Sequence, residues 1–255
     1  MFGFTNLSGG GSFFGNNWSS EGYGHHAHGG VPPWNQFDCL DLARLIRESG
    51  IDLTSLHRIL DVGGGLGLRS ILATTANPGL NRPDVHVTCV DIAPLAIHRG
   101  VRLWDDVRHG RSSPDLFGYR PEALPRHSMA FRVESAEDLP LDLLSPPPDL
   151  WLDWMFLHGL PRPLWSRYLT AVRAARPRFI LFKCFSRELA TVDSLKQTIT
   201  GIDKHLFRDA DVDAVFGPEY RRTPVVHDSP EIKNPTGHTD GIIAAKRAYV
   251  LERVG

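Results

Sequence analysis

Residues 58–72 read R-I-L-D-V-G-G-G-L-G-L-R-S-I-L, a short apolar run followed by a glycine turn and a second apolar segment. The first five residues lack a polar face, which is typical of a strand buried on both sides in a parallel sheet. Gly63, Gly65 and Gly67 allow the sharp turn that leads into a helix. This order predicts an α/β protein with a site for a nucleotide-like ligand where the helix begins.

A second acidic residue marks the same predicted site. Residues 85–90 form the next apolar strand, and Asp91 and Ile92 follow it. The interval of about 25 residues from the glycines suits one strand–helix–strand unit, and a carboxylate there can accept hydrogen bonds from both ribose hydroxyls. A buried aspartate without a partner is costly, so an acid at this place usually faces a cleft. We assign both residues to a cofactor site, and at this point NAD is not excluded.

The run D-V-G-G-G-L-G, residues 61–67, resembles the first motif of class I methyltransferases, which use S-adenosylmethionine (SAM). The resemblance implies an α/β fold with a doubly wound, mostly parallel seven-stranded sheet and helices on both faces. It also implies that Asp61 lies near the methionine end of SAM, and that Gly63, Gly65 and Gly67 line the cofactor.

Residues 130–141, A-F-R-V-E-S-A-E-D-L-P-L, resemble the third-strand segment of small-molecule methyltransferases, in which the following loop grips the adenine. Ser135 stands where that family usually has an aspartate. Ala136 can still offer its backbone N–H to an adenine ring nitrogen. The resemblance implies that both residues bind the cofactor.

Residues 149–160, D-L-W-L-D-W-M-F-L-H-G-L, resemble the fourth strand of the same family and the segment after it. Strand ends in open parallel sheets point into the binding crevice, so Asp153 is predicted to border both the cofactor and the transferred methyl group. Two interpretations of His158 stay open, a packing or orienting histidine and a general base.

Lys183 follows the predicted fifth strand, residues 179–182. Together with Asp153 it resembles half of the Lys-Asp-Lys-Glu tetrad of RNA 2′-O-methyltransferases, in which a carboxylate steers a lysine that takes a hydroxyl proton. The chain has no lysine before Lys183, and Arg247-Ala248 stands where the tetrad's glutamate begins the last strand. Lys183 is therefore interpreted either as a catalytic residue or as a salt-bridge partner of Asp153.

The composition is that of an ordinary globular protein. Of the 255 residues, 42% are hydrophobic and 22% are charged, which is enough for a sizeable core. The net charge of −1 provides no basic field for nucleic acid. The cysteines lack metal-ligand spacing, and no segment reads as a signal peptide or membrane span. We expect a cytoplasmic protein with no metal site and no membrane partner.

Residues 1–36 differ from the rest, because they are rich in Gly, Ser and Asn with scattered aromatic residues and an H-H-x-H cluster at 25–28. We interpret them as an N-terminal extension or lid ahead of a methyltransferase domain at 37–255; a disordered tail with solvated histidines is the alternative. Further predictions are a helix from Asp38 to Gly50, a helix after Ser186 that runs through Leu195, and a last, antiparallel strand within 241–252.

These features together predict a SAM-dependent methyltransferase that acts on a small-molecule acceptor. An RNA 2′-O-methyltransferase with an incomplete tetrad is one alternative, and a non-catalytic binding module of the same fold is another. The identity of the acceptor and the oligomeric state do not follow from the sequence.

Overall fold

The structure is a computed structural model of the whole chain. It describes residues 33–255 apart from 117–120, 122, 190–194, 197–202 and 234–242. Residues 1–32 of the predicted lid, with its histidine cluster, therefore lie outside the described residues, whereas residues 33–36 begin the helix Pro33–Glu48.

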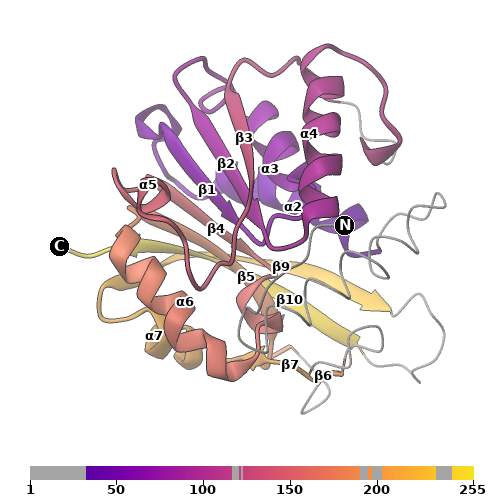
Figure 1. Ribbon diagram of the computed structural model, residues 1–255. Helices are drawn as coiled ribbons and strands as arrows, with labels where there is room; N and C mark the ends of the chain where they lie inside the picture. The colour runs from indigo at the N-terminus through magenta and orange to yellow at the C-terminus, as the bar shows by residue number, and fades with distance from the viewer. Residues whose placement is uncertain (1–32, 117–120, 122, 190–194, 197–202, 234–242) are drawn as a thin grey trace.

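A single large sheet forms the centre of the protein (Figure 1). Its strand order is β3-β2-β1-β4-β5-β10-β9, and the first five of these strands run parallel to one another. β10 runs antiparallel to both β5 and β9, which confirms the predicted antiparallel last strand. The bounds are Arg58–Val62 for β1, His86–Asp91 for β2, Ser128–Val133 for β3, Leu150–Trp154 for β4, Phe179–Ser186 for β5, Tyr220–Lys233 for β9 and Ile243–Arg253 for β10.

The predicted number of seven strands was wrong by one, because the short strand β8, Leu206–Phe207, makes the sheet eight-stranded. β4 pairs with β5 only as far as Lys183, and β8 pairs with β5 from Phe185 onward. Since β10 occupies the other edge of β5, β8 takes up the backbone groups that β4 leaves where it ends. Two further short strands, β6 (Leu195–Lys196) and β7 (Asp203–Lys204), pair with each other apart from this sheet.

Helices cover both faces of the sheet, as predicted (Figure 1). One face carries α2 (Pro33–Glu48), α3 (Leu68–Thr75) and α4 (Pro94–Arg108), and the other carries α5 (Leu141–Leu144), α6 (Arg162–Ala175) and α7 (Asp209–Phe216). Three 3-10 turns complete the described elements, η3 (Leu53–Ser55), η4 (Pro114–Leu116) and η5 (Leu157–Gly159).

Strand residues contribute alternately to the two faces. In β4, Trp151 packs with α6, whereas Leu152 and Trp154 pack in the cluster that contains α2. This alternation follows from the two-residue period of a β-strand, and it fixes the face on which each side chain of the site lies.

Two predicted helix bounds differ from the structure. Helix α2 begins at Pro33, so Asp38 lies inside it and does not cap it. The helix predicted after Ser186 is contradicted where the chain is described, since β5 continues to Ser186, residues 187–189 form a bend and Leu195 lies in β6. Strand pairing, of β5 with β8 and of β6 with β7, overrides the local helical pattern here.

Helix α4 packs closely on the sheet at Gly100, and substitution of this residue tests that packing. A Cβ placed there would lie 2.6 Å from the ring of Phe131 and 2.8 Å from the carbonyl oxygen of Leu66. We expect Gly100→Ala to lower the free energy of unfolding by about 1–3 kcal/mol, although alanine is the better helix former. Val101→Ala, on the exposed side of α4, should change it by less than about 0.5 kcal/mol. Urea unfolding followed by circular dichroism measures both, and a Gly100→Ala protein as stable as the parent would contradict this packing.

Candidate active site

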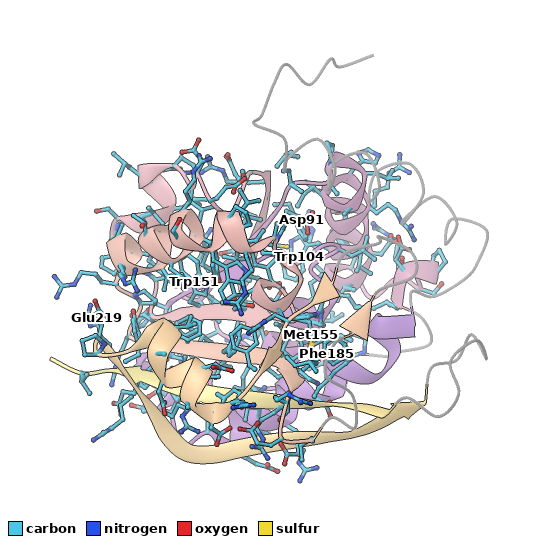
Figure 2. The ribbon with its side chains drawn as sticks, turned by 90° about the horizontal axis from the view of Figure 1, so that it is seen from below. Asp91, Trp104, Trp151, Met155, Phe185 and Glu219 are labelled. Carbon is cyan, nitrogen blue, oxygen red and sulfur yellow. The ribbon has the colours of Figure 1, made fainter. Side chains whose placement is uncertain are left out.

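The candidate site lies at the carboxyl ends of the parallel strands. The strand order reverses between β1 and β4, and such a switch point is where open α/β sheets bind ligands. In Figure 2, Met155, which follows β4, and Phe185, near the end of β5, lie toward one end of the sheet, and Glu219 lies at the other. The residues predicted for the cofactor and for catalysis gather at the first of these ends.

The glycine turn after β1 has the backbone that its sequence predicts. Gly63, Gly65 and Gly67 have φ angles of 65°, 60° and 66°, a region that favours glycine. The turn is held by two backbone hydrogen bonds, from Gly64 N to the carbonyl oxygen of Val90 at 3.2 Å and from Gly67 N to that of Gly64 at 3.0 Å. Gly67 is also the N-cap of α3, so the turn opens directly onto a helix N-terminus.

Asp91 joins this turn to the end of β2. One carboxylate oxygen accepts a hydrogen bond from Gly65 N at 2.9 Å, and the other accepts one from Ala93 N at 2.8 Å. Burial raises the pKa of Asp91, and these two N–H groups oppose that rise. The residue is nevertheless partly exposed, as is Ile92 beside it. Because each carboxylate oxygen has a second lone pair, Asp91 can still accept hydrogen bonds from a ligand.

Asp61 lies beneath the same turn and is only 4% exposed. Its Oδ2 accepts no hydrogen bond from any described residue, and a Cβ on Gly64 would lie 2.5 Å from that oxygen. Burial raises the pKa of Asp61, while Arg69 and Ser70 act in the opposite direction. A buried carboxylate oxygen without a donor is costly, so this geometry suits a cationic or hydrogen-bond-donating ligand group.

The loop after β3 lies at the same edge. Ser135 and Ala136 follow β3 and are partly buried. The Ser135 hydroxyl donates a hydrogen bond to Glu137 at 3.2 Å, and Ala136 packs against the core cluster of α5 and α6. The structure thus brings the predicted cofactor residues other than Asp153 to the carboxyl ends of β1, β2 and β3.

Asp153 is fully buried and already has donors within the protein. Its Oδ1 accepts hydrogen bonds from the backbone N–H groups of Phe156 at 3.2 Å and Leu157 at 3.0 Å, and its Oδ2 accepts one from the Tyr168 hydroxyl at 2.7 Å. Trp151 in turn donates to the Tyr168 oxygen at 3.0 Å. Burial raises the pKa of Asp153 to about 6, against the effect of these hydrogen bonds. Asp153 therefore shapes the turn after β4.

Lys183 does not form the predicted salt bridge with Asp153. Asp153 lies opposite Phe182 in the register of β4 and β5, and Lys183 lies opposite Trp154. Asp153 and Lys183 are thus on opposite faces of the sheet. The ammonium group of Lys183 pairs with Asp41 of α2, with 2.9 Å between Nζ and Oδ2, and lies 4.9 Å from the centre of the Trp154 ring.

His158 is buried in η5, and its ring meets that of Phe185 edge-on with 5.0 Å between centroids. Its carbonyl oxygen accepts a hydrogen bond from His205 N at 2.9 Å. His158 therefore lies at the same edge of the sheet as the end of β5.

Sequence reasoning missed the turn that follows β4. Met155 has a φ of 68°, which is strained for a residue other than glycine, and its N–H donates to the Lys183 carbonyl oxygen at 3.0 Å. Arg69 donates to the Trp154 carbonyl oxygen at 2.8 Å, and the Phe156 ring lies so close to Gly63 that a Cβ there would be 2.1 Å from it. No sequence signal predicts the backbone of Met155. The acid at Asp41, between two leucines of a predicted apolar helix side, was a signal that could have been read.

In the part of the chain that the structure describes, no cluster of three or more His, Cys, Asp or Glu side chains could hold a metal ion. Nor does that part of the chain contain a helix with the length and apolarity needed to cross a membrane.

Comparison with solved structures identifies the fold. Magnesium protoporphyrin IX methyltransferase from Synechocystis, solved with bound SAM, is 12% identical, with a TM-score of 0.59 over 98% of this chain and 100% of that one. A Burkholderia thailandensis 1,6-didemethyltoxoflavin-N1-methyltransferase, solved with bound 1,6-didemethyltoxoflavin and S-adenosylhomocysteine, is 12% identical, with a TM-score of 0.60 over 99% and 93% of the two chains. A SAM-dependent methyltransferase from Anabaena variabilis is 10% identical, with a TM-score of 0.62 over 98% and 96%.

No protein-family model matches the sequence, and no curated protein matches it. The solved structures align over nearly the whole chain, and they share its sheet-and-helix architecture. The protein therefore has the Rossmann-like fold of the class I, SAM-dependent methyltransferases.

The raised pKa of the buried Asp153 predicts how the stability of the fold depends on pH. Its pKa of about 6 in the folded protein lies above the ordinary value of 3.8, so the folded state holds the proton more tightly than the unfolded state. The free energy of unfolding should therefore fall as pH rises from about 4 to 6, by up to about 3 kcal/mol from this group. Asp153→Asn should remove that contribution. Urea unfolding at pH 4.5 and 7.5 checks it, and parallel pH profiles for parent and variant would contradict it.

Proposed function

We propose that this protein is a SAM-dependent methyltransferase that acts on a small-molecule acceptor. The observation that carries the proposal is the pair of carboxylates around the glycine turn. Asp61 offers a buried oxygen that no described residue satisfies, and Asp91 offers a partly exposed carboxylate at the next strand end. This pair suits a ligand that has an ammonium group at one end and a ribose near the other.

The chain's residues have distinct roles in this proposal. Asp61 would pair with the amino group of the cofactor's methionine moiety, and Asp91, with Ile92 beside it, would hold the ribose hydroxyls. Ser135 and Ala136 would face the adenine. When bound, SAM supplies a methyl group on a sulfonium, which transfers to a nucleophilic atom without a covalent enzyme intermediate. Most of the rate would then come from holding the acceptor in line.

Two neighbours of the same fold support a small-molecule acceptor, since they are a magnesium protoporphyrin IX methyltransferase and a 1,6-didemethyltoxoflavin-N1-methyltransferase. The near-zero net charge agrees with this choice over RNA. The RNA alternative requires contact between Asp153 and Lys183, as in the Lys-Asp-Lys-Glu tetrad. Lys183 instead pairs with Asp41 and lies on the face of the sheet opposite to Asp153, which argues against that alternative.

The three predicted catalytic residues have different roles in this proposal. Asp153 would act indirectly, by holding the turn of Met155 and Phe156 beside the glycine turn. Lys183 and His158 lie nearer the end of β5, where an acceptor would sit, and they remain the proposed residues for contact with the acceptor. We also propose that the protein acts in the cytoplasm.

Isothermal titration of the purified protein tests the cofactor. We expect SAM and S-adenosylhomocysteine to bind with micromolar affinity, and NAD and short single-stranded RNA at moderate salt not to bind. Asp91→Ala should weaken SAM binding by about 1–3 kcal/mol, because it removes the carboxylate that would accept the hydrogen bonds of the ribose hydroxyls. The matched control is Asp84→Ala, which replaces an exposed aspartate ahead of the same strand and should leave the SAM affinity unchanged. Saturable NAD binding without heat from SAM would refute the proposal.

The N-terminal extension is proposed to act as a lid, on the basis of its aromatic and glycine-rich sequence. Deletion of residues 1–32 stops just before α2. It should leave SAM affinity nearly unchanged, because the glycine turn and Asp91 remain, and it should lower turnover on any acceptor by at least about tenfold. A truncated protein with the parent's melting temperature and unchanged turnover would show that the extension is only a tail.

A further inference from the structure

The side chain of Phe156 packs directly against the glycine turn. A Cβ built on Gly63 would lie 2.1 Å from a carbon of the Phe156 ring, so the ring fills the space beside that glycine. Phe156 comes two residues after β4, and β4 pairs with β1, whose end leads into Gly63. Because β1 lies between β2 and β4, the ring borders the turn on the side away from Asp91.

Two contacts hold the Phe156 ring in this place. The backbone N–H of Phe156 donates a hydrogen bond to Asp153 Oδ1 at 3.2 Å. The rings of Phe156 and Tyr168 meet edge-on with 5.4 Å between centroids, and the Tyr168 hydroxyl donates to Asp153 Oδ2. Asp153 and Tyr168 are fully buried, whereas Phe156 is partly exposed. The core therefore fixes a ring that still reaches the surface beside the turn.

A row of partly exposed residues connects this ring with the proposed cofactor residues. Ser135 and Ala136 follow β3, Asp91 ends β2, Gly63 follows β1 and Phe156 follows β4, and all five are partly exposed. These strands are neighbours in the order β3-β2-β1-β4. A cofactor with its adenine at the first strand and its ribose at the second, as proposed above, would extend across the glycine turn toward Phe156.

The sulfonium group of SAM lies between the ribose and the amino acid end of the molecule. If the ribose meets Asp91 and the amino group meets Asp61, the sulfur would lie over the glycine turn, within reach of the Phe156 ring. An aromatic ring attracts a nearby cation through its quadrupole, and more strongly where water is excluded. The Phe156 ring is therefore suited to a positively charged group on the cofactor.

We infer that Phe156 is a specificity-determining residue of the cofactor site, whose ring contacts the sulfonium and favours SAM over S-adenosylhomocysteine. Methyl transfer breaks the bond between carbon and sulfur and leaves its electron pair on the sulfur, while the methyl group bonds to a lone pair of the acceptor. The product is then a neutral thioether, which loses the attraction to the ring and is released more readily. This inference rests on the proposed function, because it concerns the cofactor of the same site.

Isothermal titration of SAM and of S-adenosylhomocysteine into the parent protein and two variants tests the inference. Phe156→Leu removes the ring but keeps an apolar side chain that can touch the methyl group. It should raise the ratio of the SAM Kd to the S-adenosylhomocysteine Kd by at least about threefold, the scale of a cation–π contact. Phe156→Tyr keeps an aromatic face and should keep the ratio of the parent.

The matched control is Leu160→Ala, since Leu160 is also partly exposed and packs against the same core cluster. This variant should keep the parent's ratio even if it is less stable, and melting temperatures confirm that each protein is folded. A purely structural role of Phe156 would weaken both ligands by the same factor. That result in folded Phe156→Leu, or a Phe156→Tyr protein with the ratio of Phe156→Leu, overturns the inference alone. A parent protein that binds neither ligand would instead refute the proposed function, and the inference with it.

Discussion

The carboxylate of Asp91 accepts hydrogen bonds from Gly65 N in the glycine turn and from Ala93 N ahead of α4. These two bonds fix the turn after β1 against the end of β2, so that a backbone with three left-handed glycines keeps one shape. The helices that begin beyond each segment, α3 and α4, are placed by the same contact. The cofactor side of the candidate site is thus organised around one side chain that can still accept hydrogen bonds from a ligand.

The proposed acceptor side depends on a different constraint, the alternation of side chains along β4 and β5. Asp153 and Trp154 are consecutive, so they lie on opposite faces. Asp153 joins Tyr168 and Trp151 in a buried network that shapes the turn at Met155, whereas Trp154 lies beside Lys183. Because Trp154, and not Asp153, occupies the position opposite Lys183, the lysine meets an aromatic ring on β4 and no carboxylate. It also explains why the carboxylate that pairs with Lys183 comes from α2, far away in the sequence.

The sequence predicted most of what depends on local pattern. The turn at 63–67, the helix at Leu68–Thr75 and the strand that ends at Asp91 follow from apolar runs broken by glycine, and the structure has them. Features set by distant pairing could not be read in this way. β8 forms because β4 stops short of the end of β5, and the partner of Lys183 is fixed by how α2 packs on the sheet. The strained backbone of Met155 depends on contacts with Lys183 and with Asp153 through the next residues, which no single segment contains.

A crystal structure of the protein with S-adenosylhomocysteine tests the central claim most directly, because it locates the ligand without the need for a known acceptor. We predict that the ribose hydroxyls lie within about 2.6–3.2 Å of the Asp91 carboxylate and that the amino group lies at a similar distance from Asp61 Oδ2. A nucleoside bound away from the glycine turn, or one whose ribose makes no contact with Asp91, would contradict the account.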